Sequence, residues 1–244
     1  MATFEVAGAR MAISSTLATV AAERRSRVRI SDQFGWRPGG LGISPRVSVT
    51  SNADSADADG KMLPTGTVTL LLADIEGSTR IWESQPDRMA TALATMDRVL
   101  ADVVRANNGV CPVSQGEGDS FVVAFGRADD GVACALALQR AGLAPIRLRI
   151  GVHTGEVLLR DHGNYMGPTI NRAARLRELA HGGQTLLSGA TSDLVHGSLP
   201  DQTWLARLGS HVLRDLIQPE RVAQLCHPDL RNEFPPLRTS PVRR

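Results

Sequence analysis

The sequence predicts an α+β fold whose core elements follow one another in the order β-α-β-β-α-β. Short apolar runs of strand length occur at 68–73, 120–125 and 146–153. Longer segments between them carry apolar residues at helical spacing, and turns containing Gly, Asn or Pro separate the two kinds of segment. This order is that of the ferredoxin-like arrangement, an antiparallel sheet with helices packed on one face.

The first strand and the first long helix have the clearest patterns. The strand is expected over 68–73, an apolar run that ends at Asp74. The segment after Pro86 is expected to be an amphipathic helix, with Ser84 as its N-cap and the Asn-Asn-Gly turn at 107–109 as its end. Its apolar residues recur at spacings of four and three: Met89, Leu93, Met96, Leu100 and Val103.

The remaining elements follow from shorter signals. Apolar residues that alternate with Arg147 and Arg149 predict a half-buried strand over 146–153. Gly167 followed by Pro168 predicts the start of a third helix, because proline is favoured at the first helical position. The other expected elements are strands over 110–114 and 120–125 joined by the turn QGEGD, a helix over 129–143, and a strand over 184–188.

Composition divides the 244 residues into three regions. Residues 1–62 are rich in Ser, Gly and Ala without a sustained period, and we expect a flexible or disordered extension there. Residues 63–230 carry the regular patterning and are expected to form the folded domain. Residues 231–244, RNEFPPLRTSPVRR, are expected to be an open Pro- and Arg-rich tail.

Composition also excludes several classes of function. The chain is 42% apolar and 21% charged, as in an ordinary globular protein. Its 27 basic and 25 acidic residues give a net charge of +2, which argues against nucleic acid as the main partner. Cys111, Cys134 and Cys226 are too few for a disulfide framework or a zinc site, and Cys134 is expected to be a buried thiol. No segment has the pattern of a membrane span or a good signal peptide, so we expect a cytoplasmic protein.

Asp74 and Asp119 are the strongest candidates for metal ligands. Asp74 ends the first strand, and the turn after it, with Gly77, Ser78 and Thr79, leads into a helix. A carboxylate beside such a turn can hold a hard cation while backbone N–H groups receive phosphate oxygens. Asp119 lies in a hairpin turn that can bring it beside Asp74, and two aspartates that bridge two cations suit attack at phosphorus. The alternative is that Asp74 caps a helix and Asp119 only stabilises a turn.

Asn171 and Arg175 are four residues apart at the start of the third helix, so they share one helix face. An arginine there suits the charge that grows on phosphoryl oxygens in a transition state. The alternative is an ordinary solvent-exposed helix surface, because Arg172 and Arg177 lie nearby.

Four segments in sequence order carry a family resemblance: LLADIEGST, QGEGDSFVVAF, GVHTGEV and YMGPTINRAARL. Together they resemble the catalytic domain of class III nucleotidyl cyclases (adenylate and guanylate cyclases), of the kind numerous in mycobacteria and other actinobacteria. The resemblance covers about residues 65–227 and extends to the closing segment LGSHVLRDLIQPERVAQL. Several motifs in the same order are far more specific than any one of them.

The resemblance implies a role for each matched residue. Asp74, Asp119 and the backbone carbonyl of Ile75 match the ligands of two Mg²⁺ or Mn²⁺ ions. Asn171 matches the residue that orients the ribose, and Arg175 the residue that stabilises the α-phosphate. The implied reaction is attack of the ribose 3′-OH on the α-phosphate, which gives a 3′,5′-cyclic monophosphate and pyrophosphate. The family forms each site at the interface of a head-to-tail homodimer.

Base recognition is where this sequence departs from the family pattern. The Lys/Asp pair that reads adenine in adenylate cyclases is matched by Gln115 and Asn164, two neutral amides. Lys61, the only lysine, lies outside the expected domain. Amides both donate and accept, so we expect ATP as substrate with relaxed discrimination against GTP and modest activity. A partner cyclase of different sequence that supplies the lysine is a further hypothesis.

Two alternative functions remain open at this point. The domain could be a degenerate cyclase that binds nucleotide and acts as a regulatory or dimerisation module. It could also be another nucleotidyl transferase on a similar fold, such as a cyclic-dinucleotide synthase, although the GGDEF-type signature of those enzymes is missing.

Other conspicuous side chains are given structural interpretations. His153 and Glu156 end a strand and are expected to support the fold, and the other histidines show no metal-ligand spacing. Trp82 and Trp204 are expected to pack against other residues rather than to bind a nucleotide.

Overall fold

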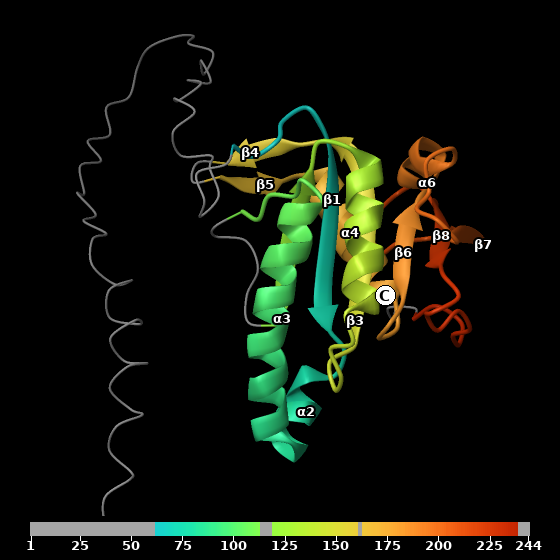
Figure 1. Ribbon diagram of the computed structural model, residues 1–244. Coiled ribbons are helices and arrows are strands. Elements are labelled where there is room, and N and C mark those ends of the chain that lie inside the picture. The colour runs from blue at the N-terminus through green and yellow to red at the C-terminus, as the bar shows by residue number, and fades with distance from the viewer. Residues whose placement is uncertain (1–61, 113–118, 161–162, 239–244) are drawn as a thin grey trace, which may run out of the picture. The chain divides into compact units, whose positions relative to one another are not determined.

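The computed structural model describes residues 62–112, 119–160 and 163–238 (Figure 1). Its main sheet has six strands in the order β2-β1-β3-β6-β8-β7. The neighbours pair antiparallel except for β3 and β6, which are parallel. The strand bounds are β1 Thr67–Ile75, β2 Ser120–Phe125, β3 Leu148–Glu156, β6 Thr185–Ser188, β7 Trp204–His211 and β8 Glu220–Cys226; β4 Leu158–Arg160 and β5 Asn164–Met166 form a separate two-stranded sheet.

The predicted β-α-β-β-α-β order is confirmed in the first part of the domain. Strand β1 lies between β2 and β3, as the ferredoxin-like arrangement requires. The strand expected at 110–114 is reduced to one isolated bridge, in which Val110 pairs with Ala124 of β2. Residues 113–118 of that expected hairpin lie outside the described residues.

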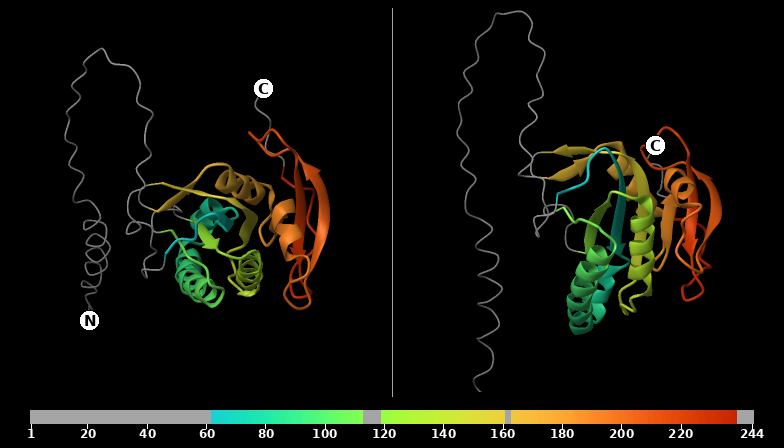
Figure 2. Two further views of the ribbon diagram at one scale, coloured as in Figure 1. Left: turned by 90° about the horizontal axis from the view of Figure 1, so that it is seen from above. Right: turned by 45° about the horizontal axis from the view of Figure 1, so that its top comes forward.

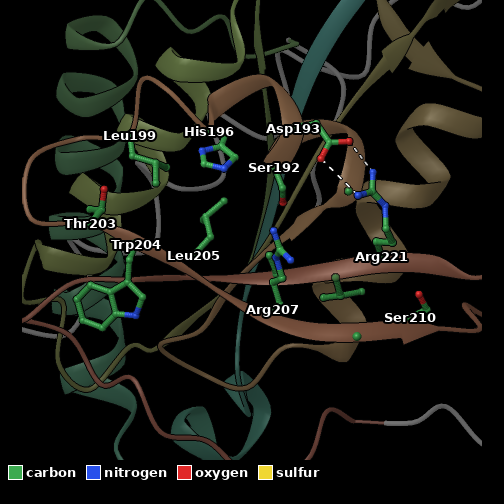
Figure 3. Close-up of a pocket in the computed structure, with 14 residues that line it drawn as sticks. Ser192, Asp193, His196, Leu199, Thr203, Trp204, Leu205, Arg207, Ser210 and Arg221 are labelled. Carbon is green, nitrogen blue, oxygen red and sulfur yellow. Dashed lines mark hydrogen bonds and ion pairs between the residues drawn. The ribbon is translucent and has the colours of Figure 1, made fainter.

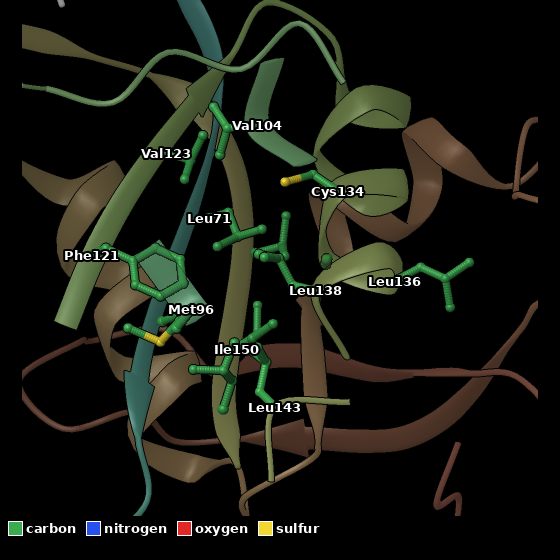
Figure 4. Close-up of a cluster of buried hydrophobic side chains, with 14 of the residues drawn as sticks. Leu71, Met96, Val104, Phe121, Val123, Cys134, Leu136, Leu138, Leu143 and Ile150 are labelled. Carbon is green, nitrogen blue, oxygen red and sulfur yellow. The ribbon is translucent and has the colours of Figure 1, made fainter. Parts of the chain in front are cut away.

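Helices cover both faces of the sheet. The helices are α2 Ser78–Ser84, α3 Pro86–Ala106, α4 Ala128–Arg140, α5 Pro168–Leu179 and α6 Gly189–Val195. Helices α3 and α4 pack on one face around a core that includes Leu71, Met96 and Leu138 (Figure 4). Helix α5 packs on the other face, where Ala173 joins a cluster with Leu70 (Figure 2). The expectation of helices on one face is therefore wrong for α5, because residues 68–75 of β1 are buried without alternation.

A glycine sets the distance between α5 and the sheet. A Cβ atom on Gly151 of β3 would lie 2.4 Å from the backbone nitrogen of Arg177 and 2.5 Å from the carbonyl oxygen of Ala173. Only a residue without a side chain fits there. Gly151 thus lets the backbone of α5 lie directly on β3, the strand beside Asp74.

Two helix boundaries differ from the predicted ones. Ser84 does not cap α3: it is the last residue of α2, and its hydroxyl donates to the carbonyl of Arg80. The N-cap is Gln85, and Pro86 occupies the first turn as expected. Helix α4 ends at Arg140 rather than 143, because Gly142 takes a positive φ of 62° that ends the helical path.

The segment after β8 packs against the domain as far as residue 238. The ring of Phe234 stacks on His181 with centroids 6.1 Å apart, and the guanidinium carbon of Arg231 lies 4.7 Å from the centroid of the same Phe234 ring. Leu237 packs against the apolar cluster that contains Leu176. The expectation of an open tail is therefore wrong for 231–238, because its two large apolar side chains find partners on α5 and the following loop.

Within the described residues, no helix combines the length and the apolar character that a membrane span requires.

Candidate active site

A polar cavity of about 900 Å³ opens at the end of β1 that carries Asp74. In the sheet register Asp74 faces Ser120 of β2 on one side and Arg149 of β3 on the other. The N–H of Ile75 donates to the carbonyl of Asp119 at 3.2 Å, which fixes Asp119 beside the strand end. The cavity is lined by most of the residues that the sequence selected: Asp74, Ile75, Gly77, Ser78, Thr79 and Asp119.

The turn after β1 has the backbone geometry that the sequence suggested. Gly77 has a φ of 66°, and it precedes the first residue of α2 without any side-chain cap. The first N–H groups of a helix have no acceptor within the helix, so those of Ser78 and Thr79 are open to a ligand in the cavity. Helix α2 has only seven residues, so its dipole contributes less than the backbone N–H groups themselves.

Asp74 is the centre of a charge network that the sequence analysis missed. Arg149 binds its carboxylate through two hydrogen bonds, each 2.6 Å long. Arg177 of α5 lies 3.3 Å from the same carboxylate. The sequence placed Arg149 on the solvent side of a half-buried strand, whereas the register puts it directly opposite Asp74.

The donor atoms at this end of β1 fit a hard divalent cation. Two carboxylates and a backbone carbonyl supply only oxygen ligands, which Mg²⁺ and Mn²⁺ prefer. Among the described residues, no group of three or more His, Cys, Asp or Glu side chains could hold a metal alone. A cation here would complete its shell with phosphate oxygens of a substrate and water, and it would share Asp74 with Arg149 or displace that arginine.

Positive charge exceeds negative charge on the cavity wall. Among the described residues, the wall has three carboxylates, those of Asp74, Glu76 and Asp119, and four guanidinium groups. Glu76 pairs with Arg147 at 3.0 Å and lies 3.8 Å from Arg238. The four arginines are Arg80, Arg147, Arg149 and Arg238. Such a wall favours a polyphosphate, because guanidinium groups bind phosphate oxygens through paired, charge-assisted hydrogen bonds.

Asn171 and Arg175 lie one turn apart on α5, as predicted, but they do not line this cavity. The guanidinium of Arg175 binds Glu178 at 2.7 Å and Asp215 at 2.9 Å. It also donates to the carbonyl of Arg214. In one chain, therefore, the arginine that reaches Asp74 from α5 is Arg177 and not Arg175.

Asn164 lies at the opposite end of the sheet from Asp74. It is in β5, which follows β3 beyond Glu156, and Glu156 pairs with Thr67 at the start of β1. The seven residue steps from Thr67 to Asp74 span about 23 Å along the strand. Figure 1 shows β4 and β5 at the end of β1 that lies away from α2. The carbonyl oxygen of the Asn164 side chain is buried without a hydrogen-bond partner among the described residues, and Gln115 lies outside them.

His153 and Cys134 are core residues, as predicted. His153 is 4% exposed, and its Nδ1 lies 2.8 Å from the hydroxyl of Ser188. Burial, with a smaller contribution from Arg172, lowers the pKa of His153 to about 4, so its ring is neutral at pH 7. Burial raises the pKa of the Cys134 thiol to about 12. Neither side chain lines the cavity at Asp74.

A second cavity of about 520 Å³ lies between α6 and the β7–β8 hairpin (Figure 3). Trp204 lines it and is 45% exposed, and Trp82 elsewhere is 43% exposed, so neither tryptophan is the packed residue that the sequence suggested. The one carboxylate on this wall, that of Asp193, pairs with Arg221. None of the predicted site residues lies there, so the cavity at Asp74 is the candidate active site.

Comparisons with known proteins identify a family of similar sequences. A sequence model described as the adenylate and guanylate cyclase catalytic domain matches residues 61–205. An uncharacterised protein of Mycobacterium tuberculosis is 62% identical over 198 residues, which cover 81% of this chain and 69% of the relative. A receptor-type adenylate cyclase of Trypanosoma brucei brucei is 30% identical over 224 residues, which cover 72% of this chain and 18% of that protein.

The fold comparison leads to the same group of proteins. A solved structure of an adenylate cyclase from Trypanosoma brucei, studied in its monomeric state, matches with a TM-score of 0.61 and 27% sequence identity. The match covers 72% of this chain and 95% of that chain.

Proposed function

The chain belongs to the adenylate and guanylate cyclase catalytic-domain family, and we propose that it converts ATP, with GTP as an alternative substrate, into the 3′,5′-cyclic monophosphate and pyrophosphate. One observation carries the proposal. Asp74 and Asp119 meet at one end of β1, in a cavity whose other described charged groups are four arginines and Glu76. This combination suits a metal-bound polyphosphate and is not expected of residues that only cap a helix and stabilise a turn.

We propose that the active site is completed by a second copy of the chain. Asn171 and Arg175 do not line the cavity at Asp74, and Asn164 lies beyond the other end of β1, which spans about 23 Å from Thr67 to Asp74. A head-to-tail dimer, in which each partner contributes a different patch, can bring these residues of one chain to the aspartates of the other. The buried amide oxygen of Asn164, which has no partner in the part of the chain that the structure describes, supports this role, since a buried polar atom is costly without a partner.

In the proposed mechanism, this chain's residues bind and orient the substrate. The N–H groups of Ser78 and Thr79, together with Arg149, hold the phosphates. Asn171 of the second chain orients the ribose so that its 3′-OH lies in line with the α-phosphate. Arg175 of that chain stabilises the negative charge that develops on the α-phosphate oxygens. Two divalent cations held by Asp74, Asp119 and the carbonyl of Ile75 would activate the 3′-OH and neutralise the leaving pyrophosphate.

The proposed base-reading pair, Gln115 and Asn164, is uncharged. An amide pair loses the charge-assisted hydrogen bond that a Lys/Asp pair provides, which weakens base binding by roughly 1–3 kcal/mol. Amides can also present either donor or acceptor to the base. We therefore propose modest activity and weak discrimination between ATP and GTP.

The test is an assay of the purified 244-residue chain with ATP and with GTP, each with Mg²⁺ and with Mn²⁺. We expect cyclic nucleotide and pyrophosphate in equal amounts, and we expect Asp74→Asn to lower the rate at least 100-fold. Asp102→Asn is the matched control, because Asp102 forms an exposed ion pair on α3 outside the cavity. If no cyclic nucleotide forms from either substrate with either metal, the proposal is wrong.

A second candidate function is a regulatory domain that binds nucleotide without turnover. It is favoured by one observation: both key side chains already have charged partners within the chain. Asp74 is bound by Arg149, and Arg175 is bound by Glu178 and Asp215. Nucleotide binding measured by calorimetry, without any cyclic product, would favour this function over catalysis.

A further inference from the structure

The last described part of the chain, residues 231–238, is held against the domain by hydrogen bonds along its length. At its start, Asn232 makes two reciprocal hydrogen bonds with the backbone of His227, at 3.2 and 3.0 Å. The carbonyl of Asn232 also accepts from Gln224 of β8 at 2.8 Å. At its middle, the carbonyl of Pro236 lies 3.0 Å from Nε2 of His181.

The end of this segment is held against the C-terminus of α5. The N–H of Arg238 donates to the carbonyl of Leu179, the last residue of α5, at 3.0 Å. Leu237 packs into the apolar cluster of which Leu179 is a member. The backbone of Arg238 therefore has a defined place, set by contacts that do not involve its own side chain.

This placement brings the guanidinium of Arg238 into the cavity with Asp74 and Asp119. Its ion-pair partner is Glu76, at 3.8 Å, and Glu76 has a closer partner in Arg147 at 3.0 Å. The Arg238 side chain is 45% exposed. Arg238 is thus a loosely paired positive charge, and it is the fourth guanidinium group on a wall whose described residues carry three carboxylates.

We propose that Arg238 is a phosphate-binding residue of the active site, delivered to it by the segment 231–238. The proposal rests on the proposed function, in that the ligand is the polyphosphate of the nucleotide and of the pyrophosphate product. On ligand binding, Arg238 exchanges its long contact with Glu76 for paired hydrogen bonds to phosphate oxygens, which match the planar guanidinium. Arg238 lies outside the residues that the family model matches, 61–205.

The experiment measures binding of magnesium pyrophosphate to the full chain by calorimetry, so that the readout does not depend on turnover. The variants are Arg238→Gln, Arg238→Lys and the matched control Arg105→Gln. Arg105 is an exposed arginine near the end of α3 and pairs with Asp102 outside the cavity. The backbone hydrogen bond of Arg238 is unaffected by these changes, and thermal unfolding checks that each variant is folded.

We expect Arg238→Gln to weaken pyrophosphate binding roughly tenfold, because it removes one partly exposed charge-assisted contact. Arg105→Gln should change pyrophosphate binding less than about twofold. Arg238→Lys should lie between wild type and Arg238→Gln, because lysine keeps the charge without the fork. In the cyclase assay, Arg238→Gln should raise the KM for ATP more than it lowers kcat.

Two results would overturn the proposal: equal or tighter pyrophosphate binding by Arg238→Gln, or an equal loss in Arg105→Gln. The proposed cyclase function fails separately, through absence of cyclic product from the wild-type chain. An Arg238-dependent pyrophosphate affinity in a chain without turnover would support the phosphate-binding role and contradict catalysis. Normal turnover of the wild-type chain, together with an unchanged pyrophosphate affinity in Arg238→Gln, would support catalysis and contradict the phosphate-binding role of Arg238.

Discussion

The two parts of the proposed active site are built in different ways. Asp74 is 9% exposed at the end of a central strand, and its partner Arg149 comes from the register of the adjacent strand. Arg175 lies on a helix surface, and its partners are Glu178 on the same helix and Asp215, whose side chain is 72% exposed. The first part is fixed by the sheet, whereas the second is held by contacts that a binding partner can replace at little cost. This difference is what we expect if the α5 surface works against a second chain.

The largest expected effect is restoration of activity by mixing two inactive variants. Asp74→Asn removes the proposed metal ligand and Arg175→Gln the proposed transition-state arginine, so each homodimer should have less than about 1% of wild-type activity. If the two residues act across a dimer interface, a mixed dimer contains one intact site. Random pairing of equal amounts should then restore about a quarter of the wild-type rate per chain.

The measurement is cyclic nucleotide formation after the two variants are mixed, unfolded and refolded together. A mixture of each variant with itself is the control. If the mixture stays inactive although both variants bind nucleotide, the two parts of the site do not belong to different chains.

The packing of α5 on β3, which connects the two parts of the site, gives the next largest effect when it is disturbed. Gly151 lets α5 lie on β3, and a Cβ atom there would contact backbone atoms of α5 at 2.4 and 2.5 Å. Since the contacts are backbone, α5 itself has to move, and we expect Gly151→Ala to lower the free energy of unfolding by about 3 kcal/mol. The shift should remove the contact between Arg177 and Asp74 as well, so metal-dependent activity should fall with stability.

Gly126→Ala is the matched control, because nothing lies within 4 Å of a Cβ atom at that position. Its free energy of unfolding should change by no more than about 0.5 kcal/mol. Denaturant titration measures both variants, and equal stability of the two would show that α5 is not held as tightly as the distances indicate.

Of the charged residues at the proposed site, the sequence selected the two aspartates but not the arginines around them. Asp74 and Asp119 follow from local signals, a strand end and a hairpin turn, and the structure places both on one cavity wall. Arg149 could not be selected, because an arginine in an alternating strand has the same pattern whether it faces solvent or an aspartate. Only the pairing of β1 with β3 decides between the two.

The later elements were missed for a related reason. Strand β7 alternates only weakly and has no fully buried residue, so its local sequence hardly distinguishes it from a loop. The segment 231–238 has few apolar residues, and its docking depends on His181 and the end of α5, which are distant in sequence. Contacts of this kind become visible only when the fold brings the segments together.

The smallest predicted effects are losses of stability, and they compare the ion pairs of Asp74 with those of Arg175. Asp74→Asn should lower the free energy of unfolding by about 2 kcal/mol, because it leaves the partly buried Arg149 and Arg177 without a charged partner. Arg175→Gln should lower it by about 0.5 kcal/mol or less, since Glu178 and Asp215 return to solvent. Denaturant titrations at low and high salt measure both. The smaller effect should decrease more at high salt, because the Asp215 partner of Arg175 is 72% exposed whereas the Asp74 side chain is 12% exposed. Equal losses for the two variants would mean that Arg175 is as firmly fixed as Asp74, and the α5 surface would then be a poor candidate for a patch that rearranges against a second chain.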